Sequence, residues 1–317
     1  MKQKHFKLNE NWLNIIDDEY KSYFLGLMLS DGFITTNYRI GLRLKNEDDY
    51  LVKQIFSQFS QNYGLNSRGI CLNSKILHIR LTQLGIVKNK TIKKLHIPKD
   101  IPSNLLNHFI RGYFDGDGSI SMVKSKKYCQ VYLCSISKNI LIEIQNQLKL
   151  HNIDSKIYVE KREGKSFKII NTIYNNCKDM FTLRIERHEN LLKFYEYLYK
   201  DCKIKMLRKY KIYEKYYTNT VLTLESKGSK AVQRIEDETF IDFNLLKSFD
   251  FWAWKEVPNM EDIRKLHYED KISMNKIGKI YNYDRTSLKD RLNKFMKEYN
   301  SSKIGRASCR ERVSSPV

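Results

Sequence analysis

The sequence predicts an α+β protein made of two similar repeats, followed by a small all-α domain. Three observations lead to this prediction. Two apolar, helix-like segments that end in Asp-Gly lie 86 residues apart, measured from Asp31 to Asp117. Comparable strand-like and helix-like patterns follow each of them, which indicates an internal repeat. A third region, from Met260 to about Tyr299, has apolar residues at helical spacing.

The first repeat begins with the segment YFLGLMLSDGFI, Tyr23–Ile34. A strand is expected from Tyr38 to Lys45, an amphipathic helix over Asp49–Tyr63 and a further strand at Ile76–Thr82. The polar faces of these strands carry Arg39, Arg43, Lys45, His78 and Arg80.

The second repeat begins with FIRGYFDGDGSI, Phe109–Ile120. A strand is expected at Gln130–Ser137, a helix at Asn139–His151 and strands at Lys156–Arg162 and Phe181–Glu186. The predicted order is therefore α-β-β-α-β-β-α, twice. The polar strand faces are basic, which a sheet that only faces water does not require.

These patterns divide the chain into domains at 1–108 and 109–217, a linker at 218–258 and a helical domain at 259–300. Some ordered packing is expected in the linker, around Trp252 and Trp254. Residues 301–317 are expected to form a disordered tail. The run IGRASCRERV, residues 304–313, has no helical or strand period and resembles a translated sequencing-adapter read.

The composition favours a nucleic-acid partner. The chain has 317 residues, with 57 Lys and Arg against 36 Asp and Glu, which gives a net charge of +21. These basic residues are mixed with 21 Tyr along the chain, as in a folded basic surface rather than a basic tail. An ordinary basic protein rich in Lys and Asn would carry a similar charge, so charge alone leaves both interpretations open.

Other classes of protein are disfavoured. No apolar run is long enough to cross a bilayer, and the N-terminus lacks the apolar stretch of a signal peptide. None of the six Cys forms a CxxC pair or lies at zinc-ligand spacing from a His. We therefore expect a reduced intracellular protein, in a cytoplasm, nucleoid or organelle matrix, that contacts no membrane.

Small residues in both Asp-Gly segments predict that the two helices pack against each other. Gly26 and Gly112 have no side chain, so the backbones can approach closely. Ser30 and Gly116, just before the acids, are also small. Such packing would place the C-terminal ends of the two helices side by side.

Asp31 and Asp117 would then lie close together, each at the negative end of a helix dipole. This arrangement is unfavourable unless divalent cations lie between the carboxylates. Paired acids that hold Mg²⁺, or Mn²⁺, are suited to phosphodiester hydrolysis. A single Asp-Gly is more simply explained as a helix end or a turn. Two of them at matching places in a repeat favour the metal site.

The two segments resemble the LAGLIDADG motif of homing endonucleases. The nine positions read FLGLMLSDG (Phe24–Gly32) and IRGYFDGDG (Ile110–Gly118), and the third, eighth and ninth match in both. The resemblance covers roughly residues 10–217. It implies a monomeric, sequence-specific endonuclease that cuts double-stranded DNA, with Asp31 and Asp117 as metal ligands. It also implies two saddle-like, four-stranded sheets that lie along the major groove.

The resemblance further implies a basic catalytic residue late in each repeat. The run LTQLGIVKNKT points to Lys90, and LYKDCKIKMLRKYKIY points to Arg208 or Lys209, of which Lys209 is the retained candidate. A lysine there would stabilise the transition-state charge or position water. The alternative is a solvated or phosphate-contacting lysine. Asp115, whose counterpart in the first motif is Leu29, is expected to have a structural role at the helix interface.

The C-terminal region resembles a resolvase-type helix-turn-helix. In ISMNKIGKIYNYDRTSLKDRLNKF, Ser273 would cap a helix, Ile277 and Ile280 would face inward, and Asn282 would lie in the turn. The recognition helix would be Arg285–Phe295. A three-helix packing module is the alternative.

The candidate DNA contacts lie on the polar strand faces or on this recognition helix. Arg suits guanine edges and Lys suits phosphates. A solvated strand face is the alternative for each strand residue. The candidates are Arg39, Arg43, Lys45, His78, Arg80, Gln130, Tyr132, Lys156, Tyr158, Arg162, Arg184, Arg285, Thr286, Lys289 and Asn293.

Two further functions are compatible with the same pattern. Some transcription regulators join a degenerate LAGLIDADG domain to a helix-turn-helix, but the retained acids favour the nuclease. An RNA maturase would also use a basic surface, which makes intron RNA a second possible partner. A free-standing protein fits better than an intein, because the chain begins with Met and has no splicing Cys or His-Asn ending.

Overall fold

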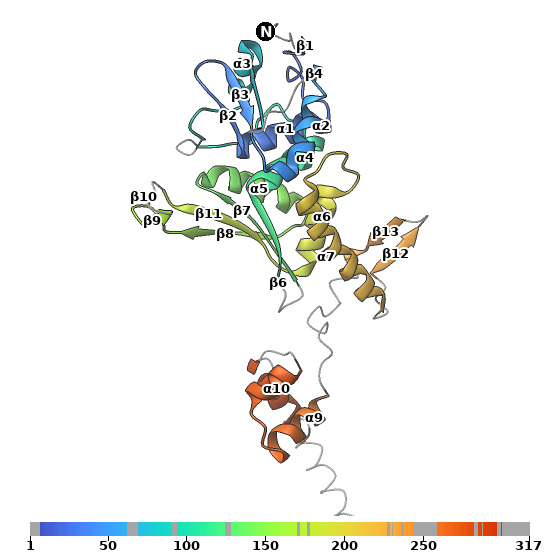
Figure 1. Cartoon of the computed structure of the whole chain (residues 1–317). Helices are drawn as coiled ribbons and strands as arrows, with labels where there is room; N and C mark the ends of the chain where they lie inside the picture. The colour runs from blue at the N-terminus through green and yellow to red at the C-terminus, as the bar shows by residue number, and fades with distance from the viewer. Residues whose placement is uncertain are drawn as a thin grey trace, which may run out of the picture. The chain divides into compact units, whose positions relative to one another are not determined.

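The computed structural model describes residues 7–61, 69–90, 94–123, 128–169, 172–175, 178–226, 229, 231–235, 238–243, 259–281, 285–286, 288–296 and 299. The chain divides into two compact units, residues 1–246 and 247–317. The first unit contains both repeats, and their elements are labelled in Figure 1. Trp252, Trp254, Asn282 and residues 301–317 lie outside the described residues.

The first repeat begins at a capped helix, because Asp18 accepts a hydrogen bond from the Lys21 amide at 2.9 Å. A short strand, β1 (Lys7–Leu8), precedes this helix and pairs with β4. The elements from there are α1 (Glu19–Ser30), β2 (Gly32–Ile34), β3 (Arg39–Leu42), the 3-10 helix η1 (Asn46–Asp48), α2 (Asp49–Phe56), β4 (Ser60–Gln61), β5 (Ile70–Asn73) and α3 (Lys75–Gln83).

The second repeat has the same order of principal elements and longer strands. Its elements are the 3-10 helix η3 (Ser103–Leu105), α4 (Leu106–Asp117), β6 (Gly118–Val123), β7 (Tyr128–Ser135), α5 (Lys138–Leu150), β8 (Ser155–Glu160), the hairpin β9 (Ser166–Ile169) and β10 (Thr172–Asn175), β11 (Met180–Ile185) and α6 (His188–Tyr199). The β9–β10 hairpin is an insertion that the sequence patterns did not predict.

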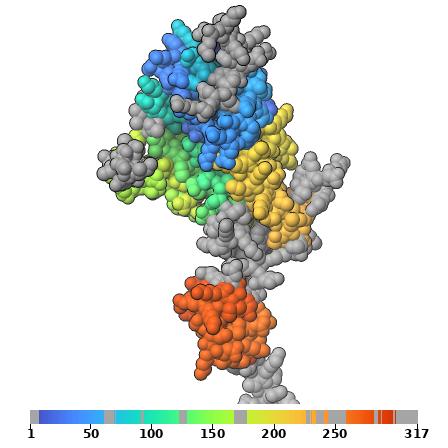
Figure 2. Space-filling model, in the orientation of Figure 1, coloured from blue at the N-terminus to red at the C-terminus, as the bar shows by residue number. Residues whose placement is uncertain are grey.

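The helices α1 and α4 lie side by side at the junction of the repeats (Figure 1). Both glycines of the predicted interface are at the contact. A Cβ on Gly26 would lie 2.6 Å from the Tyr113 amide nitrogen, and a Cβ on Gly112 would lie 3.1 Å from the Leu27 amide nitrogen. Backbone therefore meets backbone, as the small residues predicted. Figure 2 shows the surfaces of the first repeat, in blue, and of the second, in green and yellow, in direct contact.

The second repeat contains a four-stranded antiparallel sheet in the order β6-β7-β11-β8. One face packs on helices such as α5 and buries Leu133 and Leu183. The other face carries the row Ser119, Tyr132, Arg184 and Lys156, which lie opposite one another across the four strands. The predicted alternation and the predicted helix at Asn139–His151 are thus confirmed to within one or two residues.

The first repeat has a smaller sheet of three strands, in the order β2-β3-β5. The strand predicted at Ile76–Thr82 is wrong, because these residues lie in α3. The Ser74 hydroxyl caps this helix by accepting from the Leu77 amide at 3.1 Å, and Leu77 and Leu81 are buried at helical spacing. Helix α2 is present where it was predicted, with Leu51 and Ile55 among its buried residues, but it ends at Phe56.

The linker predicted at 218–258 is wrong for its first part. Helix α7 extends over Leu207–Ser226, with Val221 and Leu224 buried near its end. It is followed by an antiparallel hairpin of β12 (Val232–Ile235) and β13 (Glu238–Ile241). Residues 244–258 lie outside the described residues.

The second unit is a small helical core. Its helices are α9 (Met260–Arg264), the π-helix η5 (Lys265–Glu269), α10 (Met274–Ile280) and a helical stretch over residues 285–286 and 288–296. Ser273 caps α10 as predicted, and Ile277, Leu288 and Leu292 are buried. The prediction for Ile280 is wrong: its side chain is 59% exposed, and Tyr281 packs against the core instead.

Among the described residues, no helix combines the length and the hydropathy that crossing a membrane requires.

The close contact of α1 and α4 predicts that Gly112→Ala lowers the free energy of unfolding by about 3 kcal/mol, because the new methyl group would overlap backbone atoms of α1. Urea denaturation measures this change. Gly164→Ala is the control, since a Cβ there meets no atom within 4 Å and costs only the strain of a φ of 74°. That strain is worth about 1 kcal/mol. Equal losses for the two variants would contradict the packing.

Candidate active site at the ends of two packed helices

The C-terminal ends of α1 and α4 converge. Gly116, one residue before Asp117, lies against Ser30, and a Cβ at Gly116 would be 2.7 Å from Oδ2 of Asp31. Asp31 is the residue that ends α1, and Asp117 is the last residue of α4. The predicted convergence of the helix ends is therefore present in the structure.

Both acidic side chains are exposed to solvent on one side and surrounded by protein on the other. Partial loss of hydration raises the pKa of Asp31, while Lys209 and Lys90 oppose this rise. Partial loss of hydration, followed by repulsion from Asp31, raises the pKa of Asp117 to about 6. The two carboxylates thus act on each other electrostatically, and a cation between them would relieve the repulsion.

Lys90 neutralises the end of α1. Its Nζ donates hydrogen bonds to the carbonyl oxygens of Met28 at 3.0 Å and Ser30 at 2.7 Å. These are among the last carbonyls of the helix, which have no partner within the helix. A cation at this place also suits the negative end of the helix dipole.

Lys209 has the same relation to α4. Its Nζ donates to the carbonyl oxygens of Phe114 at 2.8 Å, Asp115 at 2.6 Å, Gly116 at 3.2 Å and Gly118 at 2.5 Å. Each helix that ends in a candidate metal ligand is therefore closed by a lysine from late in the same repeat, the part of each repeat where the family resemblance implied a basic residue.

The surroundings lower the pKa of both lysines. Burial lowers the pKa of Lys90 to about 8, against the effects of Asp117 and Asp31. Burial also lowers the pKa of Lys209 to about 8, with Asp115 opposing the change. Near neutral pH both ammonium groups stay charged, so they place two positive charges beside the two acids.

Asp115 lies at the interface of α1 and α4, as expected, and its side chain is fully buried. Its carboxylate accepts hydrogen bonds from the Tyr23 hydroxyl at 2.6 Å, the Tyr199 hydroxyl at 3.1 Å and the Met206 amide at 2.9 Å. These bonds connect α1, α6 and the segment before α7. Asp115 therefore holds the helix pair together.

The outer face of the four-stranded sheet gathers five of the predicted DNA-contacting residues. Arg184, Lys156 and Tyr132 lie in one row, and Arg184 stacks over the Tyr158 ring with its Cζ 4.7 Å from the ring centroid. Gln130 lies two residues from Tyr132 on the same strand face. Guanidinium, ammonium, amide and aromatic groups on one exposed sheet form a surface suited to nucleic acid.

Arg39, Arg43 and Lys45 are exposed on and just after β3 in the smaller sheet. The Arg39 Nε donates to Sγ of Cys71 at 2.6 Å, and the Arg43 Cζ lies 5.8 Å from the ring centroid of Phe33. These residues share one region but not one continuous strand, because β3 ends at Leu42.

The structure does not bring His78, Arg80 and Arg162 to a sheet face. In α3, a ring nitrogen of His78 lies 2.8 Å from the carbonyl oxygen of Thr35, and Arg80 pairs with Asp100 at 2.7 Å. Arg162 follows the end of β8 and pairs with Glu160 at 2.6 Å. The predicted strand positions of His78 and Arg80 are therefore wrong, and Arg162 lies two residues beyond the end of β8, the strand in which it was predicted.

In the second unit, Arg285, Thr286, Lys289 and Asn293 are exposed on the helical stretch that buries Leu288 and Leu292 on its other side. The predicted division of this stretch into a buried and an exposed face is confirmed.

Residues 104–199 match a family model described as the LAGLIDADG-like domain. Over this segment, about a third of its length, the chain is similar to that family. The match includes Asp117 and the whole four-stranded sheet. The mixed fold with antiparallel sheets is the one that the two motifs predicted.

The chain is also similar to solved structures of the homing endonuclease I-DmoI. One, of mesophilic variants, is 15% identical, covers 57% of this chain and 90% of that chain, and has a TM-score of 0.38. Another, in complex with DNA and Ca, is 14% identical, with coverages of 57% and 88% and a TM-score of 0.36. Both similarities are distant.

A curated protein of Methanocaldococcus jannaschii, named probable translation initiation factor IF-2, is 25% identical over 271 residues, or 78% of this chain. This chain spans only 21% of that protein's length.

The acid pair beside the LAGLIDADG-like sheet fits a hard divalent cation. Among the described residues, no group of three or more His, Cys, Asp or Glu side chains is placed to hold a metal. Mg²⁺ is commonly bound through one or two carboxylates together with waters and substrate phosphates. Asp31 and Asp117, exposed and mutually repelling, supply such a donor set.

Sequence patterns missed one charged pair at the edge of this site. The Arg208 Nε donates to Oδ2 of Asp48 at 2.8 Å and lies 3.6 Å from Glu47. Arg208 therefore points to the first repeat, while its neighbour Lys209 points to the end of α4. No spacing rule connects Asp48 with Arg208, because they are 160 residues apart in the chain.

The electrostatics of this acid pair predict that Asp31→Asn lowers the pKa of Asp117 below 6, because it removes a repelling charge. Carboxyl NMR titration without added divalent cations measures this pKa, and Asp17→Asn is a control outside the site.

The raised pKa of Asp117 makes the stability of the folded chain depend on pH. The folded pKa of Asp117, about 6, exceeds the ordinary value of 3.8, so the folded chain binds this proton more tightly than the unfolded chain does. This contribution to stability is full below the ordinary value and is lost as the pH rises through 6. An unchanged pKa for Asp117 in the Asp31→Asn variant would contradict the proximity of the two acids.

Proposed function

We propose that this protein is a sequence-specific endonuclease of the homing-endonuclease type, which hydrolyses phosphodiester bonds of double-stranded DNA with a divalent cation. One observation carries the proposal: two exposed acids lie at converging helix ends, and each helix is closed by a lysine, half-buried Lys90 or buried Lys209. The match of residues 104–199 to the LAGLIDADG-like domain supports it.

Asp31 and Asp117 are the residues that would hold the cation, which is Mg²⁺ or Mn²⁺ in this proposal. When bound, such a cation activates water and stabilises the leaving oxygen of the phosphodiester. The tight packing of Gly116 against Ser30 and Asp31 fixes where the two helix ends, and with them the two carboxylates, lie. Because the two acids are already in position before DNA binds, less entropy is lost when the reacting groups are ordered.

Lys90 and Lys209 would offset the negative charge that accumulates on the phosphate in the transition state. Their hydrogen bonds to helix carbonyls hold both ammonium groups in place before DNA arrives. Since these sites are partly shielded from water, each charge acts more strongly than it would in bulk solvent.

The outer face of the four-stranded sheet would contact the DNA groove. Arg184 can donate two hydrogen bonds to a guanine edge, and Lys156 suits a phosphate. The contact with Tyr158 restricts the Arg184 guanidinium, so less conformational entropy is lost when it binds. The exposed helix of the second unit, from Arg285 to Asn293, would add a second DNA contact as the recognition helix of a helix-turn-helix.

Cutting of a randomised DNA library with Mg²⁺ tests the proposal. We expect the wild type to select and cut one long, asymmetric site as a monomer. Asp117→Asn and Asp31→Asn should reduce cutting at least about a hundredfold while binding is retained. Asp17→Asn, which removes an exposed carboxylate paired with Lys21, should cut like the wild type.

The same assay distinguishes the other functions. A wild type that binds one DNA site tightly but cuts nothing at any divalent-cation concentration would favour a transcription regulator. Preferred binding of structured intron RNA, without DNA cutting, would favour a maturase. Either result would contradict the proposed nuclease function.

The second unit gives a separate prediction. Lys289→Ala should weaken DNA binding similarly for all sequences and reduce the dependence of log K on log salt concentration by about 1, as expected for one lost phosphate contact. Fluorescence anisotropy at several salt concentrations measures this slope. Lys294→Ala removes another exposed lysine of the same helical stretch, so it shows whether the change in salt dependence is specific to Lys289. An unaltered slope for Lys289→Ala would argue against a phosphate contact there.

A further inference from the structure

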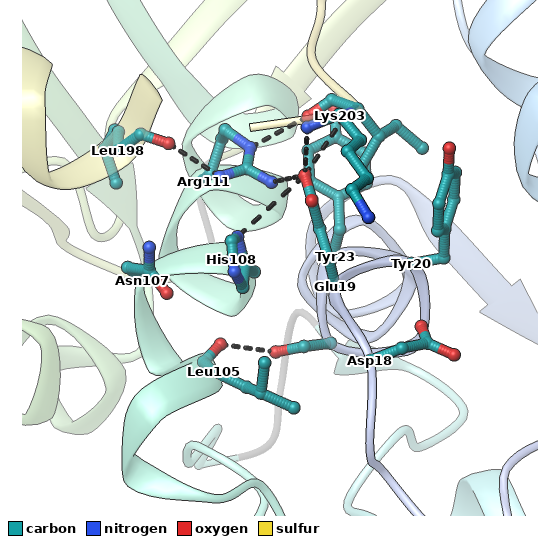
Figure 3. A network of polar contacts seen from close by, with 12 residues as sticks. Asp18, Glu19, Tyr20, Tyr23, Leu105, Asn107, His108, Arg111, Leu198 and Lys203 are labelled. Carbon is teal, nitrogen blue, oxygen red and sulfur yellow. Dashed lines mark hydrogen bonds and ion pairs between the residues drawn. The ribbon is translucent and has the colours of Figure 1, made fainter. Parts of the chain in front are cut away.

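The segment that presents Lys209 is held from the first repeat. It runs from Lys203 to Arg208, directly before the lysine, and contains no regular structure up to Met206. Glu19, in α1, accepts hydrogen bonds from the amides of Lys203 at 2.8 Å and Ile204 at 3.0 Å. Figure 3 shows Glu19 between Lys203 and Arg111.

The Tyr50 hydroxyl, in α2, holds the next part of the segment. It accepts a hydrogen bond from the Leu207 amide at 2.5 Å and lies 3.2 Å from the carbonyl oxygen of Lys205, to which it donates. Gln54, one turn later, donates to the carbonyl oxygen of Lys203 at 3.4 Å. Side chains of the first repeat thus bind several backbone groups of a segment that belongs to the second repeat.

Asp48 completes this connection. It ion-pairs with Arg208, the residue next to Lys209, at 2.8 Å. Its side chain is 1% exposed, and Oδ1 has no hydrogen-bond partner among the described residues. Although Asp48 precedes α2, its side chain does not cap that helix. A buried carboxylate with one oxygen unsatisfied adds little to stability, because its desolvation offsets much of the attraction.

The energetic cost of burying Asp48 indicates a role other than stability. Asp48 fixes the direction of Arg208, and Tyr50 fixes the backbone just before it. Together with Asp115, which accepts from the Met206 amide, they hold the chain where it enters α7, close to the point where the Lys209 ammonium meets the end of α4. A shift of about 1 Å at such a group is enough to slow catalysis a hundredfold.

We propose, on the basis of the proposed nuclease function, that Tyr50 and Asp48 of the first repeat are positioning residues for Lys209 of the second. The first repeat thereby governs cleavage of the DNA strand that Lys209 serves. The Leu95 and Ile97 amides, which follow Lys90 in the chain, bind Ser137 and Glu143 of the second repeat. Glu143 therefore binds the segment that follows Lys90, in the way that Tyr50 binds the segment that precedes Lys209, and it serves as the comparison.

The first test needs no DNA. In Tyr50→Phe, hydrogen–deuterium exchange of the amides over residues 203–210 should accelerate about fivefold or more, because the Leu207 amide loses its acceptor. Exchange over residues 94–101 should not change. Tyr217→Phe is the matched control, since its hydroxyl donates to Glu196 at 2.7 Å within the second repeat. Unchanged exchange over 203–210 in Tyr50→Phe would overturn the proposal.

The second test measures cutting of each strand separately, on the site selected by the wild type. Lys209→Met identifies the strand that Lys209 serves, as the one whose cutting slows most. Tyr50→Phe and Asp48→Asn should slow the same strand about tenfold or more, with DNA binding unchanged, so that nicked product accumulates. Glu143→Gln should not slow the strand that Lys209 serves more than the other strand. Tyr217→Phe should cut both strands like the wild type.

A purely structural role gives a different result. If Tyr50→Phe and Asp48→Asn slow both strands equally, in proportion to a lower folded fraction seen by circular dichroism, the positioning role is wrong. A slower cut on the opposite strand would also overturn it. If the wild type cuts no DNA, the proposed function fails, and the exchange measurement still decides whether Tyr50 holds the Lys209 segment.

Discussion

The candidate site depends on how closely the backbones of α1 and α4 approach. Gly26 and Gly112 remove the side chains that would hold the helices apart, and each faces backbone atoms of the other helix. This contact fixes the separation of the two helix ends, and therefore the distance over which Asp31 and Asp117 repel each other. Any side chain at the glycines would change that separation, so the geometry of the acids follows from the packing.

The same contact creates an electrostatic problem that the two lysines solve. Two helices that end side by side bring two negative dipole ends and two carboxylates into one place. Lys90 and Lys209 donate to the helix-end carbonyls and add two positive charges beside the acids. Burying these ammonium groups is costly, which the lowered pKa of each reflects. The acids remain open to solvent, so they can accept a cation and a substrate.

The sequence predicted the helix pair and the converging acids, because both rest on local residues repeated twice. The two lysines came from the family resemblance, which pointed to Lys90 and to Arg208 or Lys209. The sequence also predicted the second repeat's sheet, where long strands give clear alternation. It failed at residues 76–82, where Leu77 and Leu81 satisfy a helical period and the intervening polar residues imitate a strand. The Ser74 cap was the local signal for a helix there. Contacts such as Asp48 with Arg208 have no local signal, since they arise only when distant segments pack.

The burial of Arg111 has a consequence for how the chain can be divided. This fully buried guanidinium, on α4, pairs with Glu19 of α1 at 2.5 Å and donates to the carbonyls of Leu198 and Ile204 (Figure 3). An isolated second repeat would lose the only carboxylate paired with this charge among the described residues, along with the apolar face of α1. Fragments separated between the repeats would have to be produced together to fold, so the two halves form one obligate folding unit.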